Sequence, residues 1–148
     1  MNANQYSEDK WRLLNDEIHK RFRILAAQIL VVAPRCNPRF GKTVTKVFPL
    51  FSHVSFKRDD DIDIIVGVDI SLHDGQWQII ADITEEESGT IYFELSNLLF
   101  RASSFEELQD RVLRDTELLI SRGTPILLRQ LEPTVPGVLN QTVDLVAR

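Results

Sequence analysis

Hydrophobic residues near the N-terminus recur every three or four positions, which is the spacing of one face of a helix. This stripe consists of Trp11, Leu14, Ile18, Phe22, Leu25 and Ile29. Ser7 precedes it as a suitable N-cap, Glu8 and Asp9 occupy the first turn, and Pro34 stops the helix. The pattern therefore predicts a helix over residues 8–32.

Hydrophobic and polar residues alternate in the middle of the chain, which is typical of strands with one buried face. The alternation is strict over residues 62–72 and continues over residues 77–84 and 90–95. Asp74-Gly75 joins the first two of these segments as a tight hairpin turn. Because turns this short leave no room for crossover helices, the three segments predict an antiparallel meander.

A second β-prone stretch precedes the meander. Residues 43–56 are rich in β-branched and aromatic residues, but Pro49 interrupts them. Proline cannot donate to a ladder of hydrogen bonds, so this stretch predicts an edge strand or two short strands. The residues before it, 34–42, contain two prolines, an asparagine and a glycine, and they predict a loop.

Helical spacing returns after the meander. Ser104 and Glu107 form a capping box, and the apolar positions that follow predict a helix over about 104–122. Gly123 is expected to end this helix, and Pro125 is expected to start a short second one at its first position.

Together these elements predict an α+β fold. We expect a two-layer sandwich in which an antiparallel β-meander of three to five strands packs against an N-terminal helix and one or two C-terminal helices. Residues 1–133 are expected to form a single domain. Residues 134–148 form a C-terminal tail, which is either an arm packed on the body or on a second copy, or a partly disordered segment. The layout of this small acidic chain is similar to that of secretion chaperones and of some toxin-immunity proteins, which implies protein binding.

Composition narrows the range of functions. The chain has 148 residues and a single cysteine, Cys36, so a disulfide within the chain and a multi-cysteine zinc site are both excluded. The longest apolar run, residues 24–34, is shorter than the roughly 20 residues of a membrane span. The polar N-terminus has no apolar signal-peptide core, and we expect a cytoplasmic protein without membrane contact.

The predicted strands carry several acidic residues. Asp61 and Asp63 lie two positions apart, so they share one face of a strand, and Asp82 follows on a neighbouring strand. Carboxylates that converge in this way can hold Mg²⁺, which suggests a metal-dependent nuclease or nucleotidyltransferase-like enzyme as the alternative function. The favoured interpretation is a solvated turn followed by the polar face of a sheet, with no bound metal and no cofactor.

The outward face of the predicted sheet is the favoured binding site. It is expected to gather Asp63, Asp69, Asp82, Tyr92 and Glu94. An acidic face with an aromatic residue suits a basic protein partner, because complementary charge accelerates association and tyrosine is enriched at binding hot spots. We therefore expect a non-enzymatic protein-binding module of the immunity, adaptor or chaperone-like kind, with no catalytic residues.

Charge is distributed unevenly along the chain. The net charge is −5, made up of +7 over residues 1–58 and −12 over residues 59–148. Opposite charges can attract within the fold or across a homodimer, or each end can meet a separate partner. A nucleic-acid partner is not expected, because the isoelectric point is about 5.2.

Overall fold

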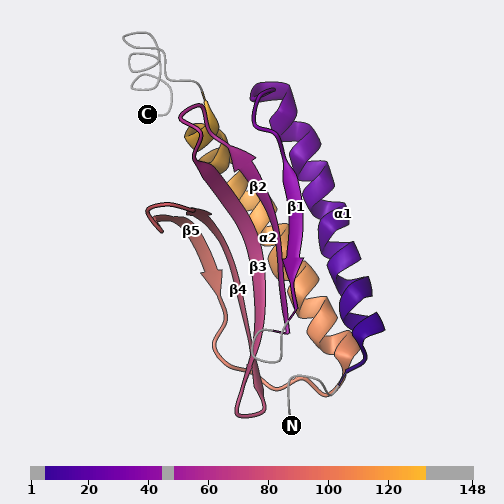
Figure 1. The fold of residues 1–148 in the computed structure, drawn as a ribbon. Coiled ribbons are helices and arrows are strands. Elements are labelled where there is room, and N and C mark those ends of the chain that lie inside the picture. Colours follow the sequence, from indigo (N-terminus) through magenta and orange to yellow (C-terminus); the bar gives the residue numbers. More distant parts are fainter. Residues whose placement is uncertain (1–5, 45–48, 133–148) are drawn as a thin grey trace.

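The computed structural model describes residues 6–44 and 49–132, which form a five-stranded sheet and two helices. Along the chain these are α1 (Glu8–Val32), β1 (Arg39–Thr43), β2 (Leu50–Lys57), β3 (Asp63–His73), β4 (Gln76–Glu85), β5 (Ile91–Ser96) and α2 (Phe105–Leu131). The strands pair antiparallel in the order β1-β2-β3-β4-β5, and both helices pack on the sheet (Figure 1). The predicted α+β sandwich with an antiparallel meander is confirmed.

The core lies between the helices and one face of the sheet. Residues that oppose one another on neighbouring strands share a face, so one buried row of the sheet contains Val54, Val66 and Ile83 and another contains Leu50, Ile70 and Ile79. All six side chains are fully buried. The strict alternation in β3 and β4 arises because every second side chain enters this layer.

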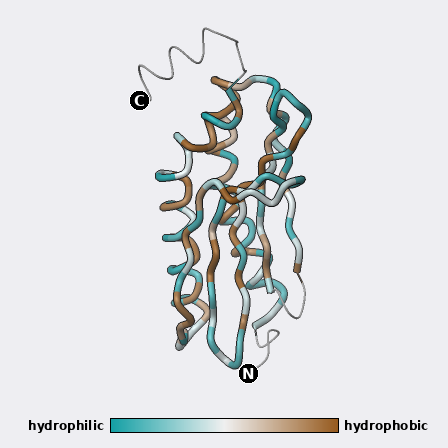
Figure 2. Tube along the Cα trace, turned by 90° about the vertical axis from the view of Figure 1, so that its left-hand side faces the viewer, coloured by the Kyte–Doolittle hydropathy of each residue, from teal (hydrophilic) through white to brown (hydrophobic). Residues whose placement is uncertain are grey.

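Local sequence sets the ends of these elements. The Ser7 side chain accepts a hydrogen bond from the Lys10 N–H, and α1 covers residues 8–32 as predicted. In the β3–β4 turn, Asp74 and Gly75 adopt φ angles of 51° and 80°. Both angles are positive, as the tight hairpin requires. The polar residues of this turn form a hydrophilic tip in Figure 2.

The C-terminal helix differs from the prediction, because α2 continues through the expected break as one helix of 27 residues. Gly123 does not end it; a Cβ atom there would lie 2.7 Å from Ile83 Cδ1, so the glycine allows α2 to approach the sheet closely. Pro125 lies inside the helix, where it lacks an N–H donor. The Thr124 hydroxyl donates to the Ile120 carbonyl one turn earlier and holds this turn together.

The segment predicted as a loop also differs. Arg39 to Lys42 belong to β1, which pairs with β2 over its whole length. This short strand is mostly exposed, so it lacks the apolar alternation from which a strand is recognised. The predicted tail, residues 134–148, lies outside the described residues. Within the described part of the chain, neither helix is long and apolar enough to cross a membrane.

Candidate functional site

The face of the sheet opposite the core carries the candidate site. Each residue on this open face alternates with a buried one, and the strand register aligns them in rows. The central row runs from β1 to β5 through Gly41, His53, Gly67, Asp82 and Glu94. The adjacent row runs through Thr43, Phe51, Asp69, Ile80 and Ser96.

Two aromatic rings lie on this open face where the central row has glycines. A Cβ atom at Gly67 would lie 2.6 Å from Phe51 Cε1, so the Phe51 ring occupies the space that a side chain at Gly67 would fill. The His53 ring covers Gly41 in the same way, and the two ring centroids are 4.9 Å apart. Burial lowers the pKa of His53, so this imidazole is neutral at neutral pH and adds no positive charge to the face.

Three carboxylates, Asp69, Asp82 and Glu94, gather beside these rings, and none of them forms an ion pair with a lysine or arginine of the described residues. Burial, together with the nearby charges of Glu94 and Asp69, raises the pKa of Asp82 to about 6, and burial is the largest of these causes. Burial also raises the pKa of Asp69, whose Oδ1 atom is buried without a hydrogen-bond partner among the described residues. Among the ion pairs of the described part of the chain, none involves Asp69, Asp82 or Glu94.

Asp63 lies at another position on the same face and is neutralised there. Its Oδ2 accepts a hydrogen bond from Arg39 Nη2 at 2.6 Å, and Lys57 Nζ lies 3.3 Å from Oδ1. Burial alone would raise the pKa of Asp63, but the hydrogen bonds from Arg39 and Lys57 outweigh burial and leave the pKa below its ordinary value. Asp63 therefore differs in charge environment from the cluster around Asp82.

The three carboxylates of the alternative enzyme function do not converge. Asp61 lies in the turn before β3, where its side chain is 86% exposed and pairs with Lys57. Asp82 lies opposite Gly67, four residues along β3 from Asp63, a distance of roughly 13 Å. Over the described ranges, no group of three or more His, Cys, Asp or Glu side chains could hold a metal ion.

Tyr92 is also separate from the Asp82 cluster. The β4–β5 register shifts between Ile83 and Thr84, and Tyr92 is the additional residue at this irregularity. Its hydroxyl donates to Glu85 Oε1 at 2.7 Å and accepts from Arg58. The structure thus brings Asp69, Asp82 and Glu94 together, whereas it places Asp63 and Tyr92 in ion-pair networks of their own.

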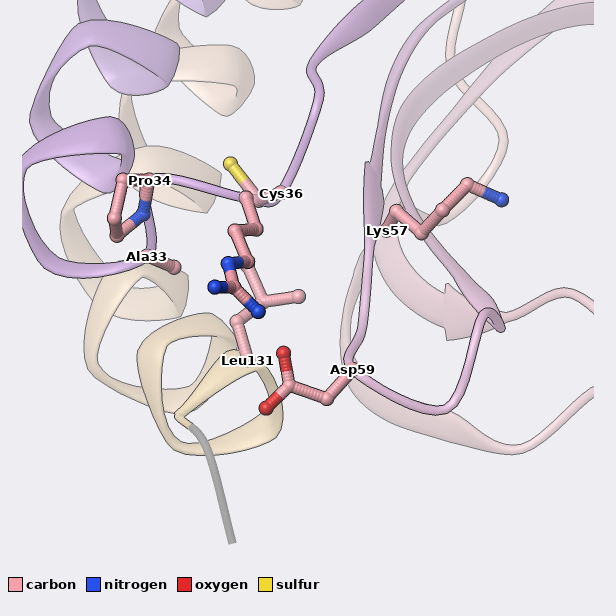
Figure 3. Close-up of a pocket in the computed structure, with 7 residues that line it drawn as sticks. Ala33, Pro34, Cys36, Lys57, Asp59 and Leu131 are labelled. Carbon is pink, nitrogen blue, oxygen red and sulfur yellow. The ribbon is translucent and has the colours of Figure 1, made fainter.

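A small pocket lies between the C-terminal ends of the two helices and the end of β2 (Figure 3). Its volume is about 180 Å³, below the roughly 300 Å³ at which small-molecule sites begin. Burial raises the pKa of the Cys36 thiol, which disfavours the nucleophilic thiolate. Figure 3 shows the Lys57 amine directed away from this pocket, and Lys57 pairs with Asp61 and Asp63. The pocket therefore carries no chemistry comparable to that of the open face.

Comparisons of the chain with protein families, curated proteins and solved structures found no match.

Sequence reasoning did not include Phe51, His53 and Gly67 in the site. Gly67 was the available signal, because a glycine inside a strand of β-branched residues marks a place where another group approaches the backbone closely. Which group approaches it depends on the pairing of β2 with β3, and the sequence alone does not fix that pairing.

Proposed function

We propose that this chain is a protein-binding module whose open sheet face receives a basic segment of another protein. The observation that supports the proposal is the group of carboxylates Asp69, Asp82 and Glu94, none of which forms an ion pair with a lysine or arginine of the described residues. Burial of the carboxyl group and repulsion from the charges of Glu94 and Asp69 both raise the pKa of Asp82. A lysine or arginine of a partner relieves this repulsion on binding.

The neighbouring aromatic rings favour the same class of ligand. Phe51 lies directly opposite Asp69 on the adjacent strand, and its ring is flanked by His53. Lysine and arginine carry long apolar stems that cover aromatic surface while their charged groups reach carboxylates. Cations are also attracted to the faces of aromatic rings. The open face therefore offers both parts of a site for a basic side chain.

The proposal is tested by calorimetric titration of the protein with an acetylated and amidated peptide in which lysine and valine alternate. The test variant is Asp82→Asn with Glu94→Gln, which removes two charges from the open face. The control variant is Asp110→Asn with Glu117→Gln, which removes two exposed charges from α2 and leaves the same net charge. A peptide with glutamate in place of lysine measures binding that is independent of charge sign.

We expect the lysine peptide to bind the wild type and the control variant, with affinity reduced about ten-fold in the test variant. Affinity should fall with added salt, because exposed charges are screened. It should also fall as the pH is lowered through about 6, since Asp82 then becomes protonated. Equal loss of affinity in both variants would show that net charge alone governs binding and would refute the site.

A further inference from the structure

We infer that the partner segment binds as an additional β-strand along the free edge of β5. The inference rests on the proposed function and specifies the form that the basic segment takes. Strand β5 is the last in the order of the sheet, so one of its sides pairs with β4 and the other pairs with no strand of the described chain. An unpaired strand edge presents N–H and C=O groups that an extended segment can bond.

The hydrogen-bonding pattern identifies which groups are free. The Asn97 N–H donates to the Ile79 carbonyl at 3.2 Å, so Asn97 turns its backbone groups toward β4. In an antiparallel strand, the backbone N–H and C=O groups of successive residues point alternately toward one neighbouring strand and toward the other side. Glu94 and Ser96 therefore direct their N–H and C=O groups outward, and no hydrogen bond from the described residues reaches them.

The surroundings of this edge are apolar and exposed. Ile91 at the start of β5 is 54% exposed, and Leu98 just beyond its end is 90% exposed. Within β5, Phe93 and Leu95 pack on the core and remain only partly buried, because no further strand covers them. Helix α2 contacts β5 on the core side of the sheet. A strand added beside β5 would extend the apolar layer of Phe93 and Leu95 along α2. The edge thus offers apolar burial in addition to backbone pairing.

Charge selects the occupant. Glu94 lies on the open face of β5 beside Asp82, so an added strand with basic residues on that face pairs with two carboxylates. A second copy of this chain, pairing through its own β5, would instead bring two further carboxylates onto the same face. Like charges on adjacent strands destabilise pairing. The partner is therefore an extended segment of another protein with alternating basic and apolar residues.

The other edge of the sheet differs in its neighbours. The Gly41 carbonyl of β1 is 3.1 Å from His19 Nε2 on α1, and the rings of His19 and Phe40 lie 5.7 Å apart. Side chains of α1 therefore already contact β1. Strand β5 has no comparable contact on its outward side among the described residues, and its regular part contains neither lysine nor proline, which commonly protect sheet edges.

The test compares Ser96→Pro with Ser96→Ala, using the peptide of alternating lysine and valine. Proline at position 96 removes an N–H that points away from β4, so the β4–β5 ladder stays intact while the free edge is blocked. Alanine removes the same hydroxyl and keeps the N–H. Unfolding in urea, followed by tryptophan fluorescence, establishes that both variants fold. A second peptide of the same sequence carries methyl groups on the alternate backbone nitrogens that would pair with β5. It tests the backbone pairing without any change to the protein.

We expect Ser96→Ala to bind as the wild type does and Ser96→Pro to bind about ten-fold more weakly. The N-methylated peptide cannot form the backbone hydrogen bonds of an added strand, so it should bind the wild type about ten-fold more weakly than the unmodified peptide does. Binding of the unmodified peptide should slow hydrogen exchange at the amides of Glu94 and Ser96. If affinity depends on Asp82 and Glu94 but changes neither with Ser96→Pro nor with the N-methylated peptide, the peptide binds the acidic face without pairing with β5. The edge site is then wrong, and the proposed function stands. If the wild type binds no lysine peptide, both the edge site and the proposed function are wrong.

Discussion

Replacement of Asp82 by asparagine should stabilise the protein at neutral and alkaline pH. Asparagine has nearly the same shape as aspartate but carries no charge, so the substitution removes repulsion with Asp69 and Glu94 and the cost of burying a carboxylate. The effect is unusual, because most substitutions of half-buried residues destabilise a protein. It is expected because none of the ion pairs formed by the described residues involves Asp82.

The size and pH dependence of this effect follow from the pKa of Asp82. Its value rises from 3.8 to about 6 on folding, so the folded state holds the proton more tightly than the unfolded state. Stability therefore declines as the pH rises from about 4 to 6, and the loss is complete above pH 6. The whole pKa shift of Asp82 corresponds to about 3 kcal/mol in the free energy of unfolding. Because Asp82 keeps contact with solvent, screening reduces this to about 1.5 kcal/mol.

The assay is urea unfolding of the wild type and Asp82→Asn at pH 4 and pH 8. Trp11 and Trp77 are both buried, so their fluorescence changes when the core unfolds. The variant should gain about 1.5 kcal/mol at pH 8 and little at pH 4, with an unchanged dependence on urea concentration. Glu94→Gln should shift the titration of Asp82 to lower pH. An equal gain at both pH values, or a loss at pH 8, would refute the reasoning.

Three further comparisons test the packing of the core and the cap of α2. Gly67→Ala should cost about 1–3 kcal/mol, because the new Cβ atom collides with the Phe51 ring, and the cost should shrink in a Phe51→Ala background when both are compared by urea unfolding. Ile18→Ala should cost about 2–5 kcal/mol, since Ile18 is fully buried, whereas Ile24→Ala on the exposed side of α1 should change stability by less than about 0.5 kcal/mol in the same assay. Ser104→Ala should cost about 1 kcal/mol through loss of the α2 cap, measured as a lower midpoint of thermal unfolding.

Elements with strong local signals were predicted accurately. Helix α1 has both an N-cap and a proline stop, and β3 and β4 alternate strictly, so the observed bounds match the expected ones within about a residue. The break at Gly123 and Pro125 was predicted wrongly, because the local preference for ending a helix is weaker than packing of α2 against Ile83. Strand β1 was missed because it is held by pairing with β2, and its own residues are mostly exposed.

Within the site, the β3–β4 register was predictable from the sequence, whereas the β4–β5 register was not. A two-residue turn at Asp74-Gly75 fixes the β3–β4 register, so the position of Asp82 opposite Gly67 follows from the sequence. The β4–β5 register shifts by one residue at Tyr92, and no sequence motif predicts this shift. That shift aligns Glu94 with Asp82 and leaves Tyr92 with Glu85.

The two groups of carboxylates on the open face show why their location points to binding. Asp63 pairs with Lys57 of the neighbouring strand β2 and with Arg39 of β1, and its pKa is lowered as in an ordinary stabilising ion pair. Among the described residues, no lysine or arginine forms an ion pair with Asp82. Ile80 and Thr84 lie on the same face of β4 as Asp82, so a lysine in place of either residue would be close enough to pair with it. Uncompensated charge of this kind lowers stability, so its presence is explained when a basic partner completes the face. Removing the charge should therefore raise stability and lower affinity together, a combination that a purely structural role for Asp82 does not produce.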